Sequence, residues 1–324
     1  MNLNEIEHRI FDIQNNLNFN NVALDIFKYQ YHNCLTYNKY CNLLNIELNA
    51  VQRIVDIPFL PIQFFKTQKI VSGDFDQEIT FSSSGTSRAT TTSKHYLKNV
   101  SLYKKSFMKA FESFYPNWKE YTIIGLLPSY LERKGSSLIY MVNHFICESQ
   151  KKESKFQLNL TPQFIDYLET DSSPKIIFGV TFALLQMAEK KIQPKNTIII
   201  ETGGMKGRGK ELTRKELHKV LQTHLKPKAI HSEYGMTELL SQAYLKGDEF
   251  TPPKWLKPLA RDITDPLTCK LEGKGALNFI DLANVHSCSF IATDDLGTVK
   301  QDGNFSVSGR IDHTQIRGCN LLIL

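Results

Sequence analysis

The feature that most constrains the fold is an alternation of apolar and amphipathic segments between residues 121 and 224. The apolar segments predict strands, and the segments between them carry apolar residues at the spacing of a helix face. We expect strands at 121–127, 175–178 and 197–201, and helices at 136–147, 182–190 and 211–224. Because this alternation is typical of βαβ units, it predicts an α/β fold with a largely parallel, helix-covered sheet.

The segments on either side of this alternation have different patterns. Apolar residues recur at helical spacing from the N-terminus to about residue 50. Pro58 and Pro61 exclude a continuous helix in the connector that follows. After Pro258, short apolar segments alternate with Gly and Asp turns, which predicts strands. We therefore expect an N-terminal helical segment at 1–55, an α/β core at 56–257 and a small β-rich subdomain at 258–324.

Composition narrows the classes of function. The formal charge of +6 is spread along the chain without a basic run, so we expect no nucleic-acid partner. The six cysteines show no Cys-x-x-Cys spacing, which disfavours a zinc site or a disulfide framework. No apolar stretch approaches the roughly 20 residues that cross a bilayer, and the N-terminus lacks a signal-peptide pattern. A cytoplasmic protein without a membrane span is expected.

A short run from Tyr234 to Glu238 combines groups suited to a nucleotide site. An aromatic ring can stack on a base, and Gly235 permits close approach of the backbone to a ligand. The Thr237 hydroxyl can donate to a phosphate, and the Glu238 carboxylate can hold Mg²⁺. We expect the run to connect a strand at 228–231 to a helix at 236–244, a location where open α/β sheets bind ligands.

Two further polar clusters accompany this run. The first is a hydroxyl-rich loop after a predicted strand at 78–81 and before a segment with helical spacing that starts at Tyr96, an arrangement that can hold phosphate. It contains Ser83, Ser84, Gly85, Thr86 and Ser87. The second cluster contains Asp295 and precedes the pair Gly309-Arg310.

A glycine-rich segment after the strand at 197–201 is nearly a P-loop. Gly204 is followed, after four residues, by Gly209 and Lys210, but Glu211 replaces the Ser or Thr whose hydroxyl coordinates Mg²⁺. A carboxylate at that position would also face the phosphates. The segment therefore disfavours a P-loop nucleotidase.

The three clusters, in this order, resemble those of the adenylate-forming superfamily of acyl and aryl ligases. The resemblance implies that Ser83, Ser84, Gly85, Thr86 and Ser87 surround the β- and γ-phosphates of ATP. It implies that Gly203 and Gly204 lie against adenosine, that Tyr234 and Gly235 face adenine, and that Thr237 contacts the α-phosphate. Glu238 would hold Mg²⁺, Asp295 would accept the ribose hydroxyls, and Arg310 would support the ribose or phosphate side.

Two departures separate this chain from the superfamily pattern. Arg88 follows the hydroxyl-rich loop where a glycine is usual. Only a few residues follow Gly309-Arg310, where the superfamily continues into a mobile domain that carries a catalytic lysine. We therefore expect that domain to be absent. With this end, the chain resembles the acyl-protein synthetases of bacterial luminescence systems.

That family passes an acyl group to a cysteine near the C-terminus. Here the resemblance points to Cys319, and the charge of Arg317 beside it would favour the thiolate. The other interpretation is that Cys319 is a small apolar residue of a terminal strand.

The predicted function is ATP-dependent activation of a fatty or aryl carboxylic acid, followed by acyl transfer to a thiol. The acceptor stays open between Cys319, a partner protein and coenzyme A. An aryl-type coenzyme A ligase and a non-catalytic nucleotide-binding subunit are the alternatives.

Overall fold

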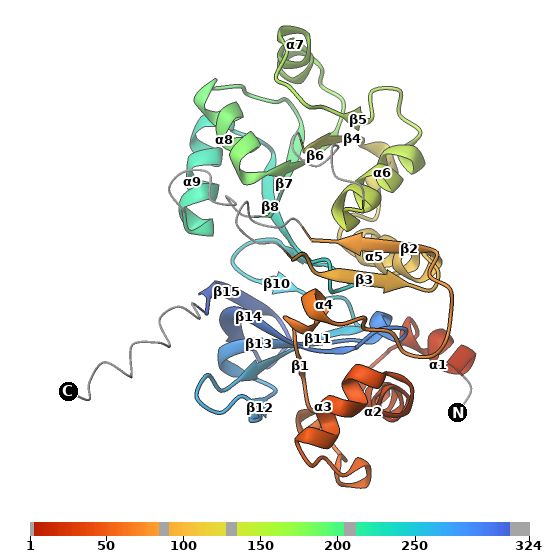
Figure 1. Cartoon of the computed structure of the whole chain (residues 1–324). Coiled ribbons are helices and arrows are strands. Elements are labelled where there is room, and N and C mark those ends of the chain that lie inside the picture. Colours follow the sequence, from red (N-terminus) through yellow and green to blue (C-terminus); the bar gives the residue numbers. More distant parts are fainter. Residues whose placement is uncertain (1–2, 84–90, 128–134, 204–211, 312–324) are drawn as a thin grey trace, which may run out of the picture.

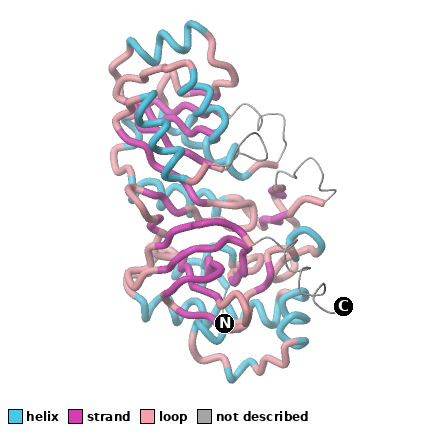
Figure 2. Tube along the Cα trace, turned by 90° about the vertical axis from the view of Figure 1, so that its left-hand side faces the viewer, coloured by secondary structure: helices cyan, strands magenta, loops and turns pink. Residues whose placement is uncertain are grey.

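The computed structural model describes residues 3–83, 91–127, 135–203 and 212–311, drawn in Figure 1 and, turned by 90°, in Figure 2. Within these ranges the strands form a 13-stranded sheet and a separate hairpin. The order in the large sheet is β12-β11-β13-β14-β15-β10-β9-β8-β7-β6-β4-β5, and β1 pairs with β14. Hairpin β2–β3 lies between the two halves of this sheet (Figure 1).

The first half of the large sheet is parallel. Its strands are β4 (Thr122–Leu126), β5 (Lys155–Phe156), β6 (Lys175–Val180), β7 (Thr197–Thr202) and β8 (Ala229–Tyr234). The central strands β4, β6 and β7 are buried along their whole length, as their runs of Ile and Val require when helices cover both faces. The predicted α/β class is confirmed.

Helices cover both faces of this parallel half. One face packs against α5 (Ser101–Phe114) and α6 (Ser137–Ser149), where Phe145 stacks on Phe178 with ring centroids 5.8 Å apart. The other face packs against α8 (Thr181–Glu189) and α9 (Arg214–Leu225), while α7 (Pro162–Thr170) precedes β6 in the chain. Close packing explains Gly179, because an added Cβ would lie 2.5 Å from Leu184.

The second half of the sheet is antiparallel and starts where β9 (Ala243–Leu245) pairs with β8. Its other strands are β10 (Phe250–Thr251), β11 (Leu256–Arg261), β12 (Cys269–Lys270), β13 (Gly273–Asp281), β14 (Phe290–Val299) and β15 (Phe305–Arg310). Hydrogen bonds therefore continue from the parallel half into the β-rich half. The predicted division between residues 257 and 258 falls inside β11.

The N-terminal residues form helices, as predicted: α1 (Leu3–Ile10), α2 (Asn16–Asn33) and α3 (Leu35–Leu43). They pack on the antiparallel half, where Phe27 and Tyr37 contact Phe290 of β14. The connector contains β1 (Leu60–Pro61) and α4 (Phe64–Thr67), and short 3₁₀ turns occur at Leu48–Ala50, Ile54–Asp56, Trp118–Glu120 and Leu282–Asn284. In the described part of the chain, no helix is long and apolar enough to cross a membrane.

Two local predictions are wrong. Residues 236–244 form a turn that leads into β9, not a helix. The backbone N–H groups of Leu240 and Ser241 donate to the Asp281 carboxylate, both at 2.9 Å, and so are bound by a buried side chain instead of helical carbonyls. The Asp281 carboxylate, distant in the sequence, thus prevents the helix that the local sequence favours.

The second error concerns the hydroxyl-rich loop. It joins β2 (Ile79–Ser82) to β3 (Lys94–Leu97), which pair antiparallel, so the predicted strand–loop–helix is a hairpin. The helix starts only at Ser101. His95 and Leu97 are buried and their neighbours less so, which is the two-residue period of a strand. Tyr96 matched the helical spacing by coincidence.

Candidate active site

Tyr234 ends β8 at the seam between the two halves of the sheet. Its ring packs against the rings of Phe250, Phe279 and Phe305, and the residue is 8% exposed. Its hydroxyl donates to Oδ2 of Asp295 at 2.7 Å. Burial, with the negative charge of Asp295, raises the pKa of this hydroxyl well above its ordinary value. The hydroxyl therefore stays protonated and serves as a donor.

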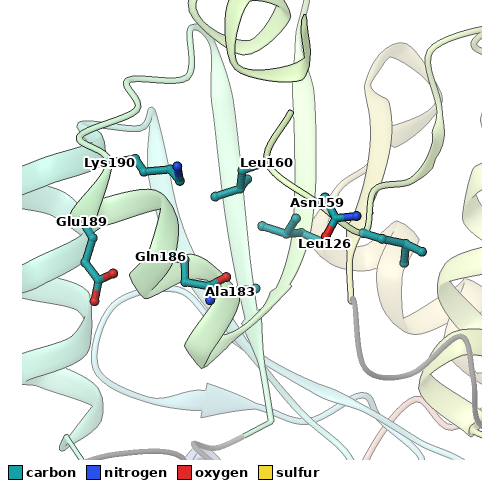
Figure 3. Close-up of a pocket in the computed structure, with 8 residues that line it drawn as sticks. Leu126, Asn159, Leu160, Ala183, Gln186, Glu189 and Lys190 are labelled. Atoms are coloured by element: carbon teal, nitrogen blue, oxygen red, sulfur yellow. The ribbon is translucent and has the colours of Figure 1, made fainter. Parts of the chain in front are cut away.

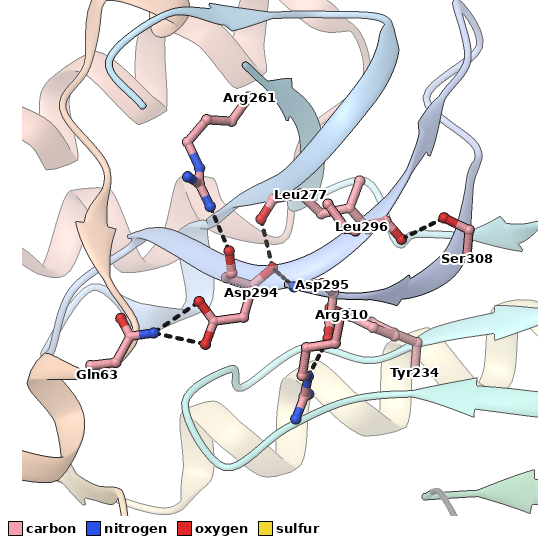
Figure 4. A network of polar contacts seen from close by, with 10 residues as sticks. Gln63, Tyr234, Arg261, Leu277, Asp294, Asp295, Leu296, Ser308 and Arg310 are labelled. Carbon is pink, nitrogen blue, oxygen red and sulfur yellow. Dashed lines mark hydrogen bonds and ion pairs between the residues drawn. The ribbon is translucent and has the colours of Figure 1, made fainter. Parts of the chain in front are cut away.

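Asp295 links Tyr234 to Arg310 (Figure 4). Asp295 of β14 is paired in register with Arg310 of β15, whose Nε donates to Oδ1 at 2.9 Å. The charge of Asp295 raises the pKa of the Arg310 guanidinium, although this side chain is 73% exposed. Each carboxylate oxygen accepts one protein hydrogen bond and retains a lone pair that a ligand hydroxyl could use. The sequence motifs that contain these three residues are thus in direct contact.

The strand under this contact is held by buried polar groups. Arg261 donates to the Thr293 carbonyl at 2.6 Å and to Asn278 Oδ1 at 2.9 Å. Gln63 donates to both carboxylate oxygens of Asp294, at 2.8 and 2.7 Å (Figure 4). These bonds hold the two residues that precede Asp295 in β14, so its carboxylate is positioned before any ligand arrives.

Thr237 and Glu238 lie in the turn after β8. Glu238 is 6% exposed, and burial raises the pKa of its carboxyl, an effect that Ser93, Lys66 and Arg310 partly offset. The turn itself is fixed by Asp281, whose fully buried carboxyl has a pKa raised by burial to about 6 and also accepts a hydrogen bond from the Ser241 hydroxyl.

His95 is a neighbour of this turn that the sequence analysis missed. Its ring is buried, with Nδ1 2.9 Å from the Thr237 carbonyl oxygen and Nε2 2.7 Å from Ser287 Oγ. Burial lowers the pKa of His95 to about 4, so the ring is neutral near pH 7. A carbonyl can only accept, so Nδ1–H donates to Thr237 and Nε2 accepts from Ser287. No local motif marks His95; only the hairpin brings it to residue 237.

A second group that sequence reasoning missed surrounds Glu201, at the end of buried strand β7. Its carboxyl oxygens lie 2.9 Å from the Thr181 hydroxyl oxygen and 3.0 Å from that of Ser232. His218 Nε2 lies 2.9 Å from Ser232 Oγ. Burial raises the pKa of Glu201, and the charge of Arg214 opposes this effect. A glutamate that ends an otherwise apolar strand was the available signal.

The remaining predicted residues are placed as follows. Ser83 closes the hairpin, because its Oγ accepts from Ser93 N at 2.9 Å. Gly203 follows β7 with φ of +70°, a conformation that favours glycine, and its carbonyl accepts from Thr181. Gly235 is exposed at the end of β8. The other predicted residues, Ser84, Gly85, Thr86, Ser87, Gly204 and Cys319, lie outside the described residues.

A pocket of about 310 Å³ opens on the α8 face of the parallel half (Figure 3). Leu126, Leu160 and Ala183 supply apolar surface, and Asn159, Gln186 and Lys190 supply polar groups. No described residue of the predicted nucleotide site lines this pocket.

Solved structures of other enzymes share this fold. ATP-bound MatB from Rhodopseudomonas palustris matches with a TM-score of 0.54 and 15% identity, over 74% of this chain and 49% of MatB. O-succinylbenzoate coenzyme A synthetase (MenE) from Bacillus subtilis, in complex with AMP, matches with a TM-score of 0.51 and 14% identity, over 72% of this chain and 50% of MenE. This chain thus has the fold of adenylate-forming enzymes and spans about half the length of these two.

Residues 9–324 match the family model of the acyl-protein synthetase LuxE. The chain belongs to this family, as the resemblance noted in its motifs implied. No curated protein matches it significantly.

Proposed function

We propose that this protein activates a carboxylic acid with ATP to form an acyl-adenylate, and then transfers the acyl group to a thiol. Membership of the acyl-protein synthetase family supports the class of reaction. The observation that carries the proposal is the contact of Asp295 with both Tyr234 and Arg310. The motif of Tyr234 thus meets Asp295, 61 residues further along the chain, and its neighbour Arg310 around one carboxylate.

In the first step, a carboxylate oxygen of the substrate attacks the α-phosphorus of ATP, and the bond to pyrophosphate breaks. This reaction depends on positioning and on neutralisation of charge more than on covalent help from the protein. Asp295 would accept the ribose hydroxyls through its remaining lone pairs, and Arg310 would support the ribose or phosphate side. Thr237 would contact the α-phosphate.

The adenosine and phosphate contacts extend the same proposal. Gly235 would face adenine, and Gly203 and Gly204 would lie against adenosine. The Tyr234 ring is enclosed by Phe250, Phe279 and Phe305, so it supports this site through Asp295 and is not free to stack on the base. The hydroxyl-rich loop, Ser83 to Ser87, would surround the β- and γ-phosphates. The closure of hairpin β2–β3 by Ser83 and Ser93 supports this assignment, because it holds both ends of the loop.

Glu238 is the proposed ligand of Mg²⁺. Among the described residues no group of three or more His, Cys, Asp or Glu side chains is placed to hold a metal. One buried carboxylate suits Mg²⁺, since this ion is usually held by one or two carboxylates with substrate phosphates and water. When bound, the ion would neutralise negative charge on the phosphates.

In the second step, a thiolate attacks the acyl carbon, a C–S bond forms, and AMP leaves as the C–O bond breaks. Cys319 is the proposed nucleophile, with a partner protein or coenzyme A as the other acceptors. An aryl-type coenzyme A ligase would differ in this step alone. We also propose that the protein carries out both steps in the cytoplasm, the compartment expected from the sequence.

Isotope exchange between labelled pyrophosphate and ATP tests the first step. We expect exchange that depends on an added carboxylic acid and on Mg²⁺. Glu238→Gln should slow exchange by roughly 100-fold and weaken its dependence on Mg²⁺, whereas Glu272→Gln, at an exposed position, should not. If a broad panel of acids gives no exchange, the chain is a nucleotide-binding subunit and not a ligase.

Acyl labelling tests the second step. Wild-type protein given ATP and a labelled acid should retain a label that hydroxylamine removes. Cys319→Ser should keep pyrophosphate exchange but lose this label, with Cys147→Ser, an exposed cysteine, as the matched control. A label that persists in Cys319→Ser would exclude this cysteine as the carrier.

A further inference from the structure

A chain of polar side chains leads to Gly203, at the end of the parallel half of the sheet. Thr181, the first residue of α8, places its Oγ1 2.7 Å from the Gly203 carbonyl oxygen and 2.9 Å from Oε1 of Glu201 on β7. The other carboxyl oxygen, Oε2, lies 3.0 Å from Ser232 Oγ on β8. That hydroxyl oxygen lies 2.9 Å from Nε2 of His218 on α9. One continuous chain of contacts thus connects α9, β8, β7 and α8 to Gly203.

The middle of this chain is shielded from water. Thr181, Glu201 and Ser232 are 3%, 7% and 0% exposed. Buried polar groups are normally paired with one another when water cannot reach them. Each contact between two of these groups therefore needs one proton between its heavy atoms. The number of available protons limits the charge that the chain can hold.

Thr181 is the residue at which the proton count decides. Its hydroxyl has one proton, but its oxygen is within hydrogen-bond distance of two other oxygens. The Gly203 carbonyl can only accept a hydrogen bond, and an ionised Glu201 could also only accept one. Whichever of the two the Thr181 proton served, the other short contact would have no proton. A protonated Glu201 resolves this conflict, because Oε1–H donates to Thr181 and Thr181 donates to Gly203.

The other end of the chain agrees with this assignment. Ser232 donates its proton to Oε2 of Glu201, so its oxygen accepts from His218. Burial lowers the pKa of His218 to about 4, and the charge of Arg214 acts in the same direction. The neutral ring has one N–H, which the contact with Ser232 places on Nε2. With Glu201 protonated, each of the four contacts then has one proton.

The charged groups around Glu201 come from α9 and β8. Burial raises the pKa of Glu201, and the charge of Arg214 opposes this effect. In the described ranges Arg214 forms no ion pair with Glu201, and its guanidinium lies over the Phe250 ring, 4.6 Å from the centroid. On β8, the pKa of Glu233 is raised mainly by burial, and a charge on Glu201 would raise it further. A buried carboxyl without a cation in direct contact is expected to be neutral.

We propose that Glu201 is a neutral carboxylic acid in the folded protein and that it positions Gly203, through Thr181, for the proposed adenosine contact. Gly203 has a φ of +70°, and the bond from Thr181 to its carbonyl holds this conformation. The inference rests on the proposed function and adds a positioning residue to it, because Glu201 acts through Thr181 and not on ATP itself.

Infrared spectroscopy tests the neutral state without any need for activity. The difference spectrum of wild type minus Glu201→Gln at pH 7 should contain the C=O stretching band of a protonated carboxylic acid. The matched control is Glu272→Gln, which removes an exposed carboxylate and should give no such band. Absence of the band from the Glu201→Gln difference would overturn the inference.

Calorimetric titration with ATP tests the positioning role. Glu201→Gln keeps a donor for Thr181 and an acceptor for Ser232, so its Kd for ATP should stay within about threefold of wild type. Thr181→Val keeps the shape of the side chain but removes the hydroxyl, and should raise the Kd by roughly tenfold. Thr181→Ser keeps the hydroxyl and should bind like wild type. In pyrophosphate exchange, Thr181→Val should raise the KM for ATP and leave kcat within about threefold.

The outcomes separate this inference from the function on which it rests. If Glu201→Gln weakens ATP binding as much as Thr181→Val does, Glu201 acts as an ion and the inference is overturned. Unchanged binding in Thr181→Val would overturn the positioning role and leave adenylation intact. If wild type neither binds ATP nor exchanges pyrophosphate with any acid, the proposed function fails, and the positioning role fails with it.

Discussion

On one face of β8 the hydroxyls of Ser232 and Tyr234 each donate to a carboxyl group, of Glu201 and Asp295 respectively. On the other face, the Glu233 carboxylate receives a bond from Thr202, while two buried polar groups beside it lack partners in the described part of the chain. Both hydroxyl donors of the first face are therefore paired without a ligand. The second is incomplete, and the difference indicates which face is fixed by its own hydrogen bonds.

The largest loss of stability is expected from a substitution that removes the hydrogen bonds around Tyr234. Asp295→Ala leaves the Tyr234 hydroxyl buried without an acceptor and Arg310 without its partner, which should reduce the free energy of unfolding by about 3 kcal/mol. Urea unfolding measures this loss. The control is Asp248→Ala, because Asp248 and Lys215 form an exposed pair with N and O 3.5 Å apart, which contributes little. Equal stability of the two variants would mean that the Tyr234–Asp295–Arg310 contact does not hold this face.

A smaller effect on stability is expected from the titration of Glu233, on the other face of β8. The pKa of Glu233 is raised to about 7 in the folded protein, above its ordinary value of 4.5. Its contribution to stability is therefore fully present below the ordinary value and is lost as the pH rises through about 7. The stability of wild type relative to Glu233→Gln should fall by on the order of 2 kcal/mol between about pH 5 and pH 8.

Urea unfolding at several pH values measures the difference in free energy of unfolding between wild type and Glu233→Gln. The other titrating groups, such as Asp281, are present in both proteins, so their contributions cancel in this difference. The substitution Glu272→Gln should give a flat difference. A flat difference for Glu233→Gln as well would show that its carboxyl is not held in a buried setting.

The smallest effects come from a matched pair of tyrosines, one on each face. Tyr234→Phe removes a hydroxyl that donates to Asp295 and should cost about 1 kcal/mol. Tyr244→Phe removes an unpaired hydroxyl and should be neutral or stabilising by up to about 1 kcal/mol without ligand. Tyr103→Phe, whose hydroxyl is paired with Ser137, should behave like Tyr234→Phe. A clear loss of stability in Tyr244→Phe would show that the Tyr244 hydroxyl does have a hydrogen-bond partner.

The sequence predicted strands β4, β6 and β7 and helices α6, α8 and α9, because each of these segments follows a regular apolar pattern, but it did not predict the short strand β5 or helix α7. It failed in the turn after Tyr234, where the donors of Leu240 and Ser241 are bound by Asp281, about forty residues further along the chain. It failed again at β3, a strand too short for its period to outweigh the helical spacing that follows. Both failures occur next to the site, where contacts with distant residues decide the local conformation.

The residues of the proposed site could be named from the sequence where they belong to short motifs. Tyr234, Asp295 and Arg310 were each named from such motifs, and the fold brings their side chains into contact. His95 and Glu201 were not named, because their partners Thr237 and Ser232 are adjacent only after the chain has folded.

By itself, the sequence determined the α/β class and the helical N-terminal segment, and it supplied the short motifs from which a nucleotide site is proposed, because periodicity and motif residues are local properties of a chain. The tertiary structure decided which of those residues meet, and which polar groups are paired. Those properties depend on the register of β8 with β9 and of β14 with β15. Register sets the face of each side chain, so only the folded sheet could separate the completed face of Tyr234 from the incomplete face of Glu233.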